Sequence, residues 1–540
     1  MLVKKRIRSL KNCPMNTFLY KETGDLSDLP LLCHYPVRAQ YVSNDPAYLG
    51  CKKKECRKRD DKGACKFYTC RPTLSFHVVN FRTPVEFVLF SKRFKSPKML
   101  KRSDPVQFTN PDMPLHGRLS SIDSTGTSMR LSWVSGSKRP QRVVYGDGQS
   151  ATSVVSTFTR DEMCGSSKLP SPAMDFGWHD PGYIHTAPMI GLKPSSKFSY
   201  KYGSELAGWS DEMELKTPPA GGSAELTCII YGDMGKAPLD KSLEHYIQPG
   251  SLSVINAIKE EIADEIKIDS IFHIGDISYA TGFLIEWDYF LKMIQPLASR
   301  VSYMTAIGNH ERDFPMSGSI YPTMDSGGEC GVPYEAYFPM TNCKKDKPWY
   351  SIEQGPVHFT VISTEHPFNF YSEQYKWMKK DLKSVNRSRT PWVIVAGHRP
   401  MYSSKGGKSI YPALIDPSFV LAVEPVLMRS KVDIMFVGHH HNYERTCAVY
   451  NGKCYGTIKK DKNGVETYYG KKYTAPVHII AGMAGFALDP FTTSPKKWSL
   501  TRISEFGYVK LHATTKTINV QFVNAKTKLV RDNFQIVKYN

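Results

Sequence analysis

Side chains that commonly bind metal ions follow glycine at, or just beyond, the ends of several short apolar runs. They are Asp233, Asp276, Asn309, His398, His439 and His441. Two carboxylates, an amide oxygen and three imidazoles form a mixed oxygen and nitrogen set that suits iron, manganese or zinc. One ion would rarely use six protein ligands and keep an open position. Two ions that share a carboxylate can use all six and clamp both sides of a displacement at phosphorus. The set therefore predicts a dinuclear site with hydrolytic chemistry.

The apolar runs predict the strands that would position these side chains. They are LTCIIYGD (226–233), DSIFHIGD (269–276), VSYMTAIGN (301–309), VHFTVIST (357–364), PWVIVAGH (391–398), VDIMFVGH (432–439) and VHIIAGMAG (477–485). Helix-like segments at 251–266 and 371–385 alternate with them, which is typical of a layered α/β domain. Ligand sites form at the carboxyl ends of strands, where a glycine permits a tight turn. We therefore expect the six side chains to share one crevice.

The triplet His439-His440-His441 needs a separate interpretation for each histidine. Side chains two residues apart at a strand end face the same way, so His439 and His441 are expected to enter the crevice together. His440 is expected to point away and to bind no metal.

Five short blocks of this sequence resemble, in order, the ligand blocks of the purple acid phosphatases, within the calcineurin-like metallophosphoesterase superfamily. The blocks are GDMG (232–235), GDISY (275–279), GNHE (308–311), VAGH (395–398) and GHHH (438–441). Neighbouring segments such as WHDPGYIHTA and DSGGECGVPYEAYFP are similar to the long plant-type branch, which includes nucleotide pyrophosphatase/phosphodiesterase-like members. The resemblance covers residues 73 to 540.

The resemblance implies a metal-ligand role for seven residues. Asp233, Tyr279 and His441 would bind Fe(III), Asn309, His398 and His439 would bind a divalent ion (zinc, manganese or iron), and Asp276 would bridge the two ions. Tyr279 discriminates between families, because a phenolate stabilises Fe(III) and its charge transfer gives these enzymes their colour. Its place three residues after Asp276 lets both side chains reach one ion.

The activity implied is that of an acid phosphatase, which hydrolyses phosphate monoesters with a metal-bound hydroxide and no covalent intermediate. Asn309, His310 and Arg399 would contact the substrate, and His310 would also act as the catalytic residue that protonates the leaving group. A packing role for His310 is the alternative. The family's pair of pocket histidines is replaced by Gly407 and Lys408. This departure leaves room for diesters or pyrophosphates, and for a weakly active or inactive homologue that binds metal and phosphate.

Sequence patterns along the chain predict several domains. Alternating apolar and polar residues with turn signals predict a small antiparallel sandwich over 110–218, and the Pro/Gly-rich stretch at 217–225 marks a boundary. With the resemblance, the expected fold class is an α/β C-terminal metallophosphoesterase domain, a two-sheet αββα sandwich, preceded by an all-β fibronectin type III-like sandwich and a partial β-rich N-terminal region. The expected boundaries are 1–72 (an unplaced basic, Cys-rich segment), 73–109 (β-rich), 110–221 (sandwich) and 222–540 (catalytic domain with a C-terminal purple acid phosphatase segment).

Positive charge is concentrated near the N-terminus. The formal net charge is +20, and residues 1–104 carry 23 Lys and Arg against 9 Asp and Glu. A solvated basic face is the favoured interpretation, because no interleaved aromatic pattern accompanies the charge. Polyanion binding by this segment is the alternative function. Specific nucleic-acid recognition is not expected.

Cysteine spacing bears on the compartment. Cys51, Cys56, Cys65 and Cys70 lack the C-x2-C spacing typical of structural zinc, so disulfides or free thiols are favoured there. Cys447 and Cys454 bracket an Asn-Gly turn, which suits a disulfide and an oxidising compartment. The sequon Asn386-Arg387-Ser388 indicates the same.

The remaining expectations concern location and partners. The N-terminus lacks the apolar segment of a secretory signal, so the chain is either intracellular or lacks its true start. The family resemblance implies a secreted or vacuolar protein. The absence of a run of eighteen apolar residues argues against a membrane span. The expected partners are a small phosphate ester or nucleotide substrate and a second copy in a homodimer.

Overall fold

A computed structural model of the protein describes most of the chain. The described residues are 38–43, 70–75, 78–91, 98–165, 169–175, 177–237, 248–263, 267–406, 415–470 and 473–538. Residues 1–37 and 44–69, with Cys51, Cys56, Cys65 and most of the basic segment, lie outside this part. Gly407 and Lys408 also lie outside it. Expectations for these positions stay predictions.

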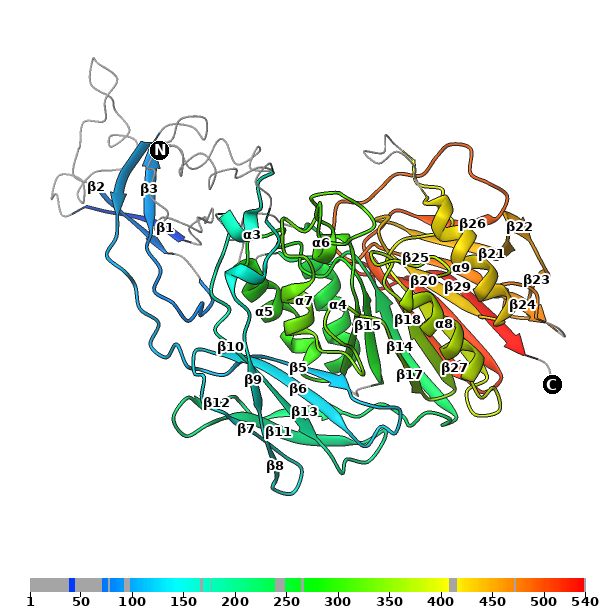
Figure 1. The fold of residues 1–540 in the computed structure, drawn as a ribbon, viewed down its shortest axis with the longest axis horizontal. Helices are drawn as coiled ribbons and strands as arrows, with labels where there is room; N and C mark the ends of the chain where they lie inside the picture. The colour runs from blue at the N-terminus through cyan, green and yellow to red at the C-terminus, as the bar shows by residue number, and fades with distance from the viewer. Residues whose placement is uncertain are drawn as a thin grey trace, which may run out of the picture.

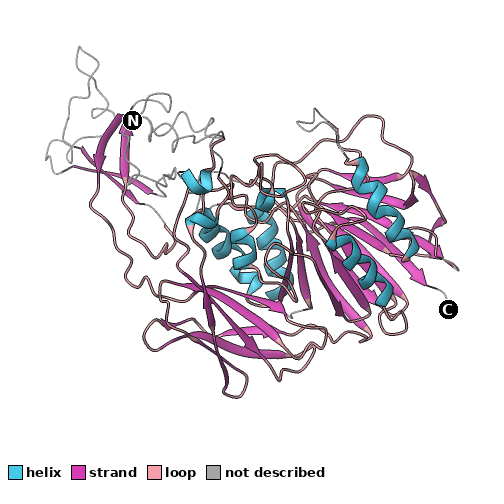
Figure 2. Cartoon of the chain, viewed as in Figure 1, coloured by secondary structure: helices cyan, strands magenta, loops and turns pink. Residues whose placement is uncertain are grey.

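Two eight-stranded sheets form the centre of the C-terminal domain (Figures 1 and 2). The first runs β16 (Ser302–Ala306), β15 (Ser270–Ile274), β14 (Glu225–Tyr231), β27 (Gly507–Thr514), β28 (Thr517–Asn524), β29 (Val530–Lys538), β24 (Glu466–Gly470), β23 (Thr457–Lys460). The second runs β17 (Tyr350–Gln354), β18 (Val357–Val361), β19 (Trp392–Ala396), β20 (Ile434–Val437), β25 (Val477–Ala481), β21 (Tyr443–Tyr450), β22 (Lys453–Cys454), with β26 (Ser499–Ile503) paired to β21. All seven predicted strand runs are confirmed.

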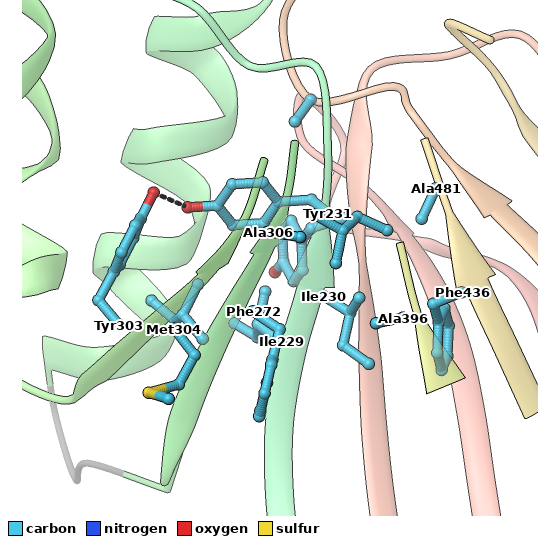
Figure 3. Packing of buried hydrophobic residues seen from close by; sticks show 14 of the residues in the cluster. Ile229, Ile230, Tyr231, Phe272, Tyr303, Met304, Ala306, Ala396, Phe436 and Ala481 are labelled. Carbon is cyan, nitrogen blue, oxygen red and sulfur yellow. Dashed lines mark hydrogen bonds between the residues drawn. The ribbon is translucent and has the colours of Figure 1, made fainter. Parts of the chain in front are cut away.

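The two sheets pack face to face through apolar side chains. Phe272 of β15 and Phe359 of β18 stack with ring centres 4.2 Å apart. Figure 3 shows part of this core, with Ile230 and Phe272 as paired neighbours on β14 and β15, and with Tyr231 bonded through its hydroxyl to Tyr303. The strands that form this layer are buried on both faces, which explains why they are continuous apolar runs rather than alternating ones.

Helices cover the outer faces of both sheets (Figure 2). On one flank lie α4 (Ser251–Ala263), α5 (Glu286–Ala298), α6 (Asn309–Arg312) and α7 (Val332–Tyr337), and on the other lie α8 (Glu373–Ser384) and α9 (Pro417–Arg429). The predicted αββα sandwich is confirmed, as are the helices expected at 251–266 and 371–385. Helices α5 and α9 were harder to predict, because Pro296 and Pro425 lie inside them and proline normally interrupts a helix.

A β-sandwich precedes this domain, as predicted. One sheet runs β5 (Leu115–Ser121), β6 (Met129–Ser135), β10 (Tyr183–Met189), β9 (Val154–Ser156). The other runs β12 (Gly208–Trp209), β11 (Lys197–Ser204), β7 (Arg142–Tyr145), β8 (Gln149–Thr152), with β13 (Met213–Lys216) paired to β11. Trp133 and Tyr202 are buried at its centre. The sandwich contacts α5 and β16, where Tyr200 donates to the carbonyl of Ser299 at 2.7 Å.

The N-terminal portion is also β-rich. It contains the antiparallel pairs β1 (Arg38–Ser43) with β2 (Cys70–Ser75) and β3 (Val88–Ser91) with β4 (Lys98–Arg102). Arg82 connects this portion to the C-terminal domain, because its guanidinium donates twice, at 2.8 Å, to the carboxylate of Asp288 on α5. Within the described residues, no helix has the length and apolar character needed to cross a membrane.

Two disulfides lie in the described part of the chain. Cys447–Cys454 closes the short loop for which the sequence predicts a disulfide. Cys164–Cys330 joins positions 166 residues apart and was not predicted, because sequence spacing gives no signal for so distant a pair. It links the β-sandwich half of the chain to the C-terminal domain. Short helical segments, η3 (Arg160–Glu162) and α3 (Pro172–Asp175), flank Cys164.

The buried His358 makes stability depend on pH. Its Nε2 lies 3.1 Å from Asp381 Oδ2 on α8, and its Nδ1 lies 3.5 Å from Glu353 Oε1 on β17. Burial alone would lower the pKa of His358, but Asp381 and Glu353 raise it to about 9. The charged imidazole therefore stabilises the fold fully below its unfolded pKa of 6.5, and this contribution is lost as the pH rises through 9.

The matched experiment compares melting temperatures of the parent and of His358→Gln across this pH window. We expect the parent to lose more stability than the variant, by about 3 kcal/mol from the size of the pKa shift. Equal losses in both proteins would contradict this account.

Candidate metal centre

The first sheet brings three predicted ligands to one edge. Asp233 follows β14, Asp276 follows β15 and Asn309 follows β16, and these strands are parallel neighbours. Close approach requires glycine, because a Cβ on Gly308 would lie 2.3 Å from Asp276 Oδ1. Parallel register therefore gathers three side chains from positions far apart in the chain.

The second sheet brings the histidines to the same place. His398 follows β19, and His439 and His441 follow the adjacent parallel strand β20. Here too glycine is needed, since a Cβ on Gly438 would lie 2.4 Å from Asp233 Oδ2. The crevice thus lies between the strand ends of two sheets.

Four of the side chains in the crevice belong to residues in the left-handed backbone region. The φ angles are 60° for Asp233, 52° for Asp276, 50° for Tyr279 and 67° for His439. Non-glycine residues seldom adopt this region, and such strain clusters at functional sites. The value for His439 corrects the expectation that strand alternation orients it, because β20 ends at Val437. A turn, held by the His439 amide donating to Asp233 Oδ2 at 2.9 Å, does so instead.

One group of ligand atoms surrounds the hydroxyl of Tyr279. This oxygen lies 3.2 Å from Asp233 Oδ1, 3.1 Å from Asp276 Oδ2 and 3.2 Å from His441 Nε2. Asp233 Oδ1 and His441 Nε2 are themselves 3.3 Å apart. The two carboxylates, the phenol and the imidazole therefore meet at one point.

A second group surrounds the amide oxygen of Asn309. Its Oδ1 lies 3.0 Å from His398 Nε2 and 2.9 Å from His439 Nδ1. His398 Nε2 is also 3.3 Å from Asp276 Oδ1. Asp276 belongs to both groups, one carboxylate oxygen facing each. The structure thus brings all seven predicted positions together in two clusters that share one carboxylate.

The donor set of each cluster fits a cation. Within each, acceptor oxygens and imidazole nitrogens converge, and candidate ligand atoms lie within 4.8 Å of one another. The first cluster has the hard anionic oxygens that a trivalent ion prefers, and the second has the amide and imidazole groups of a divalent site.

Charge in the crevice centres on Asp276. Burial would raise the pKa of this carboxyl, but His398 and His310 outweigh that effect and hold the pKa well below its usual range. Burial would lower the pKa of His398, but Asp276 is the main group that raises it, to about 10. Asp276 is therefore an anionic ligand group, and a cation that binds here displaces the proton of His398.

His310 lies beside Asp276 and Tyr279. Its backbone N–H donates to Asp276 Oδ1 at 3.0 Å, and its Nε2 lies 3.9 Å from Asp276 Oδ2. Its ring packs against Tyr279 with centres 4.4 Å apart. The side chain is 20% exposed, so it can meet a molecule from solvent.

Arg399, which the sequence predicts to contact substrate, is engaged by buried carboxylates. Its Nε donates to Glu365 and its Nη2 to Asp313, both at 2.8 Å. Its Nη1 lies 3.2 Å from His439 Nε2, and the guanidinium stacks 3.9 Å from the ring centre of Tyr321. Arg399 therefore lies behind His439, and its contact with substrate stays a prediction.

His440 lies outside both clusters, as predicted. Its Nδ1 is 2.6 Å from Ser403 Oγ, and burial lowers its pKa well below the ordinary value. The three adjacent histidines are thus divided between the crevice and a structural contact.

Several residues around the site carry no local sequence signal, because none of them is a ligand type that directly follows a strand-end glycine. Asp489 accepts from the His441 amide at 2.8 Å and pairs with Lys405 Nζ at 2.8 Å. Phe486 packs against Tyr279 and His441, with ring centres 4.7 and 4.4 Å away. Both follow β25, whose run ends in glycine without a ligand type, so the pattern of glycine plus ligand passes over this loop.

Comparison with known proteins agrees with this geometry. Family models match as follows: Fn3-like domain from Purple Acid Phosphatase (10–110), Purple acid Phosphatase, N-terminal domain (114–217), Calcineurin-like phosphoesterase (226–443) and Iron/zinc purple acid phosphatase-like protein C (475–533). The first match includes most of the segment that the sequence left unplaced. The fold and the site define the chain as a calcineurin-like phosphoesterase.

Individual relatives narrow the class further. "Probable inactive purple acid phosphatase 27" of Arabidopsis thaliana is 35% identical over 531 residues, covering 96% of this chain and 81% of the relative. "Nucleotide pyrophosphatase/phosphodiesterase" of Hordeum vulgare is 35% identical over 61% of this chain and 88% of the relative. The structure of purple acid phosphatase PPD1 from yellow lupin (Lupinus luteus) seeds aligns with TM-score 0.79 and 32% identity, covering 94% of this chain and 90% of that one. The chain belongs to the purple acid phosphatase family.

Glu311 holds the two loops that carry Asp276 and Asn309. Its carboxylate accepts from the amides of Asp276 at 2.9 Å, Ile277 at 2.7 Å and Gly308 at 3.0 Å. In Glu311→Ala these buried donors lose their acceptor, at about 1–3 kcal/mol each. We expect a large fall in melting temperature.

The control is Glu373→Ala, which removes a carboxylate from an exposed ion pair with Lys347 and should barely change stability. Similar melting of the Glu311 variant, the control and the parent would overturn the anchoring role.

Proposed function

We propose that the chain is an acid phosphatase that hydrolyses phosphate monoesters at a dinuclear centre of Fe(III) and a divalent ion. Asp233, Tyr279 and His441 would hold the iron, Asn309, His398 and His439 would hold zinc, manganese or iron, and Asp276 would bridge. The observation that carries this proposal is the shared carboxylate of Asp276, with one oxygen in each ligand cluster. Membership of the purple acid phosphatase family supports it.

The proposed hydrolysis needs both the metal ions and side chains of the protein. When bound, the two ions supply an activated water and offset charge on the phosphoryl oxygens. His310, whose side chain is 20% exposed and lies beside Asp276, would bind the phosphate and give a proton to the leaving oxygen. Asn309, which precedes His310 on α6, would be a second contact with the substrate.

Substrate class and compartment are part of the proposal. Small phosphate esters or nucleotides are the substrates we propose, and diesters and pyrophosphates are the nearest alternatives. The Cys164–Cys330 and Cys447–Cys454 disulfides support an oxidising compartment, secreted or vacuolar.

A weakly active homologue is the second candidate function. Some relatives are named probable inactive purple acid phosphatases. Arg399 is also held by Asp313 and Glu365 rather than free to meet substrate. In this alternative the metals and inorganic phosphate bind, while turnover of phosphate esters stays near the background rate.

Tyr279→Phe tests the iron assignment. The parent should contain two metal ions per chain and show a tyrosinate-to-iron band in the visible spectrum. Tyr279→Phe should lose the band and most of its activity on p-nitrophenyl phosphate at acidic pH, because the phenolate ligand is gone. Tyr303→Phe, the same change at another buried, hydrogen-bonded tyrosine, should keep both.

The outcomes separate the candidates. A parent with neither iron nor the band would refute the purple-enzyme assignment. Metals and the band without turnover would select the weakly active homologue.

Single substitutions in the histidine triplet test the division of ligands. His441→Ala should lower iron content, and His439→Ala should lower divalent-metal content, each by removing one ligand. His440→Val should leave both metals and activity in place, since His440 faces Ser403. Metal analysis of the purified variants measures all three, and metal loss from His440→Val would contradict the assignment.

A further inference from the structure

The loop at residues 325–330, here called the Asp325 loop, lies beside the metal centre and connects it to the other half of the chain. It follows α6, which carries Asn309 and His310, and ends just before α7. Ser326 donates to the carbonyl of Asp313 at 3.0 Å, and Gly331 donates to the carbonyl of Glu311 at 2.7 Å. The loop is thus attached to the helix that presents Asn309.

Asp325 contacts the amide of Asn309 directly. Asn309 Nδ2 donates to Asp325 Oδ2 at 3.0 Å, and the Thr323 hydroxyl donates to the same oxygen at 2.7 Å. Because the amide nitrogen faces a carboxylate, Asn309 Oδ1 must face the opposite way. There it meets His398 and His439, the partners of the proposed divalent site.

The same residue orients His310. The backbone carbonyl of Asp325 lies 3.1 Å from His310 Nδ1. A carbonyl can only accept, so Nδ1 carries a proton and Nε2 is the nitrogen turned toward Asp276. One residue therefore sets the orientation of a metal-ligand candidate and of the proposed acid.

The far end of the loop supports the segment after Tyr279. Glu329 accepts from the Gly282 amide at 2.8 Å through Oε1 and from Trp287 Nε1 at 2.9 Å through Oε2. The backbone approach is tight, because a Cβ on Gly327 would lie 2.0 Å from the carbonyl oxygen of Thr281. Displacement of the Asp325 loop would therefore move both Asn309 and the segment after Tyr279.

The β-sandwich half of the chain holds this loop from outside. Cys330 forms a disulfide with Cys164, which lies between β9 and β10. Beside the disulfide, the Cys164 amide donates to the Gly328 carbonyl and the Ala173 amide to the Gly327 carbonyl, both at 2.9 Å. A covalent bond and two backbone hydrogen bonds thus fix the loop to a segment that contributes no side chain to the two ligand clusters.

We propose that Asp325 is a positioning residue for the divalent-ion site. We also propose that the Cys164–Cys330 disulfide, formed with the β-sandwich half of the chain, keeps the Asp325 loop in this position. The inference rests on the proposed function, since it assigns a support to the Asn309 ligand. It adds a role for the N-terminal half of the molecule in maintaining metal affinity. Outer contacts of this kind change metal affinity by about 10- to 100-fold when they are removed.

The first test substitutes Asp325 with the disulfide intact. In Asp325→Ala the Asn309 amide loses its anchor, and we expect affinity for the divalent ion, measured by equilibrium dialysis of zinc, to fall at least about tenfold. Iron content and the tyrosinate band should persist, because their ligands are untouched. Asp325→Asn keeps an acceptor oxygen and should recover much of the affinity. Asp325→Leu fills a similar volume without an acceptor and should not, which separates the hydrogen bond from a steric effect.

The second test removes the disulfide. Cys164→Ser with Cys330→Ser should weaken zinc binding in the same direction and raise amide hydrogen exchange at residues 325–331. The matched control removes Cys447–Cys454, a disulfide within the β21–β22 hairpin, and should change neither quantity. Thermal unfolding checks that each variant is folded.

Each result bears on the proposal. Unchanged zinc affinity in Asp325→Ala, or unchanged exchange and affinity in the disulfide variant, would overturn it. Loss of iron together with zinc in Asp325→Ala would also count against a specific positioning role. A parent that binds no metal would instead refute the proposed function. The hydrogen-exchange comparison would still test whether the Cys164–Cys330 disulfide holds the Asp325 loop.

Discussion

The shared carboxylate of Asp276 is the constraint on which the rest of the site depends. A buried anion is costly unless cationic or hydrogen-bonding groups surround it. Here the imidazole of His398 lies beside Oδ1 of Asp276 and the imidazole of His310 lies near Oδ2. The backbone N–H of His310 donates to Oδ1. Because each oxygen faces a different ligand cluster, small movements of this residue would change both. The two sheets must therefore meet with their strand ends in a fixed relation.

The fold meets that requirement with local strain and long-range support. Holding non-glycine residues in the left-handed region costs about 1–3 kcal/mol each, and such conformations persist only where the surroundings enforce them. Glu311 accepts two backbone hydrogen bonds from the loop of Asp276 and one from Gly308 beside Asn309, and Asp489 accepts from the backbone amide of His441. Interdomain contacts extend the support outward, through Arg82 and Asp288 and through the Cys164–Cys330 disulfide.

Sequence patterns predicted the ligands better than their supports. Glycine followed by Asp, Asn or His at strand ends was enough to locate five of the clustered residues, the spacing of two residues from His439 added His441, and resemblance added Tyr279. The supports Asp325 and Asp489 have no such local pattern, because their partners are chosen by the folded arrangement. Likewise, Cys164 and Cys330 are too distant in sequence to pair by spacing, and His439 owes its direction to a turn rather than to strand alternation. The β-sandwich and the α/β layering were predictable because periodicity and apolar runs are local properties, whereas the two-sheet αββα arrangement was implied by the family resemblance.

The most direct test of the account is a crystal structure of the metal-loaded protein, with each ion identified by anomalous scattering at its absorption edge. The account predicts two peaks about 3.5 to 4 Å apart, one on each side of Asp276, with iron next to Tyr279 and the divalent ion next to Asn309. A single peak, or two ions that do not share Asp276, would contradict it.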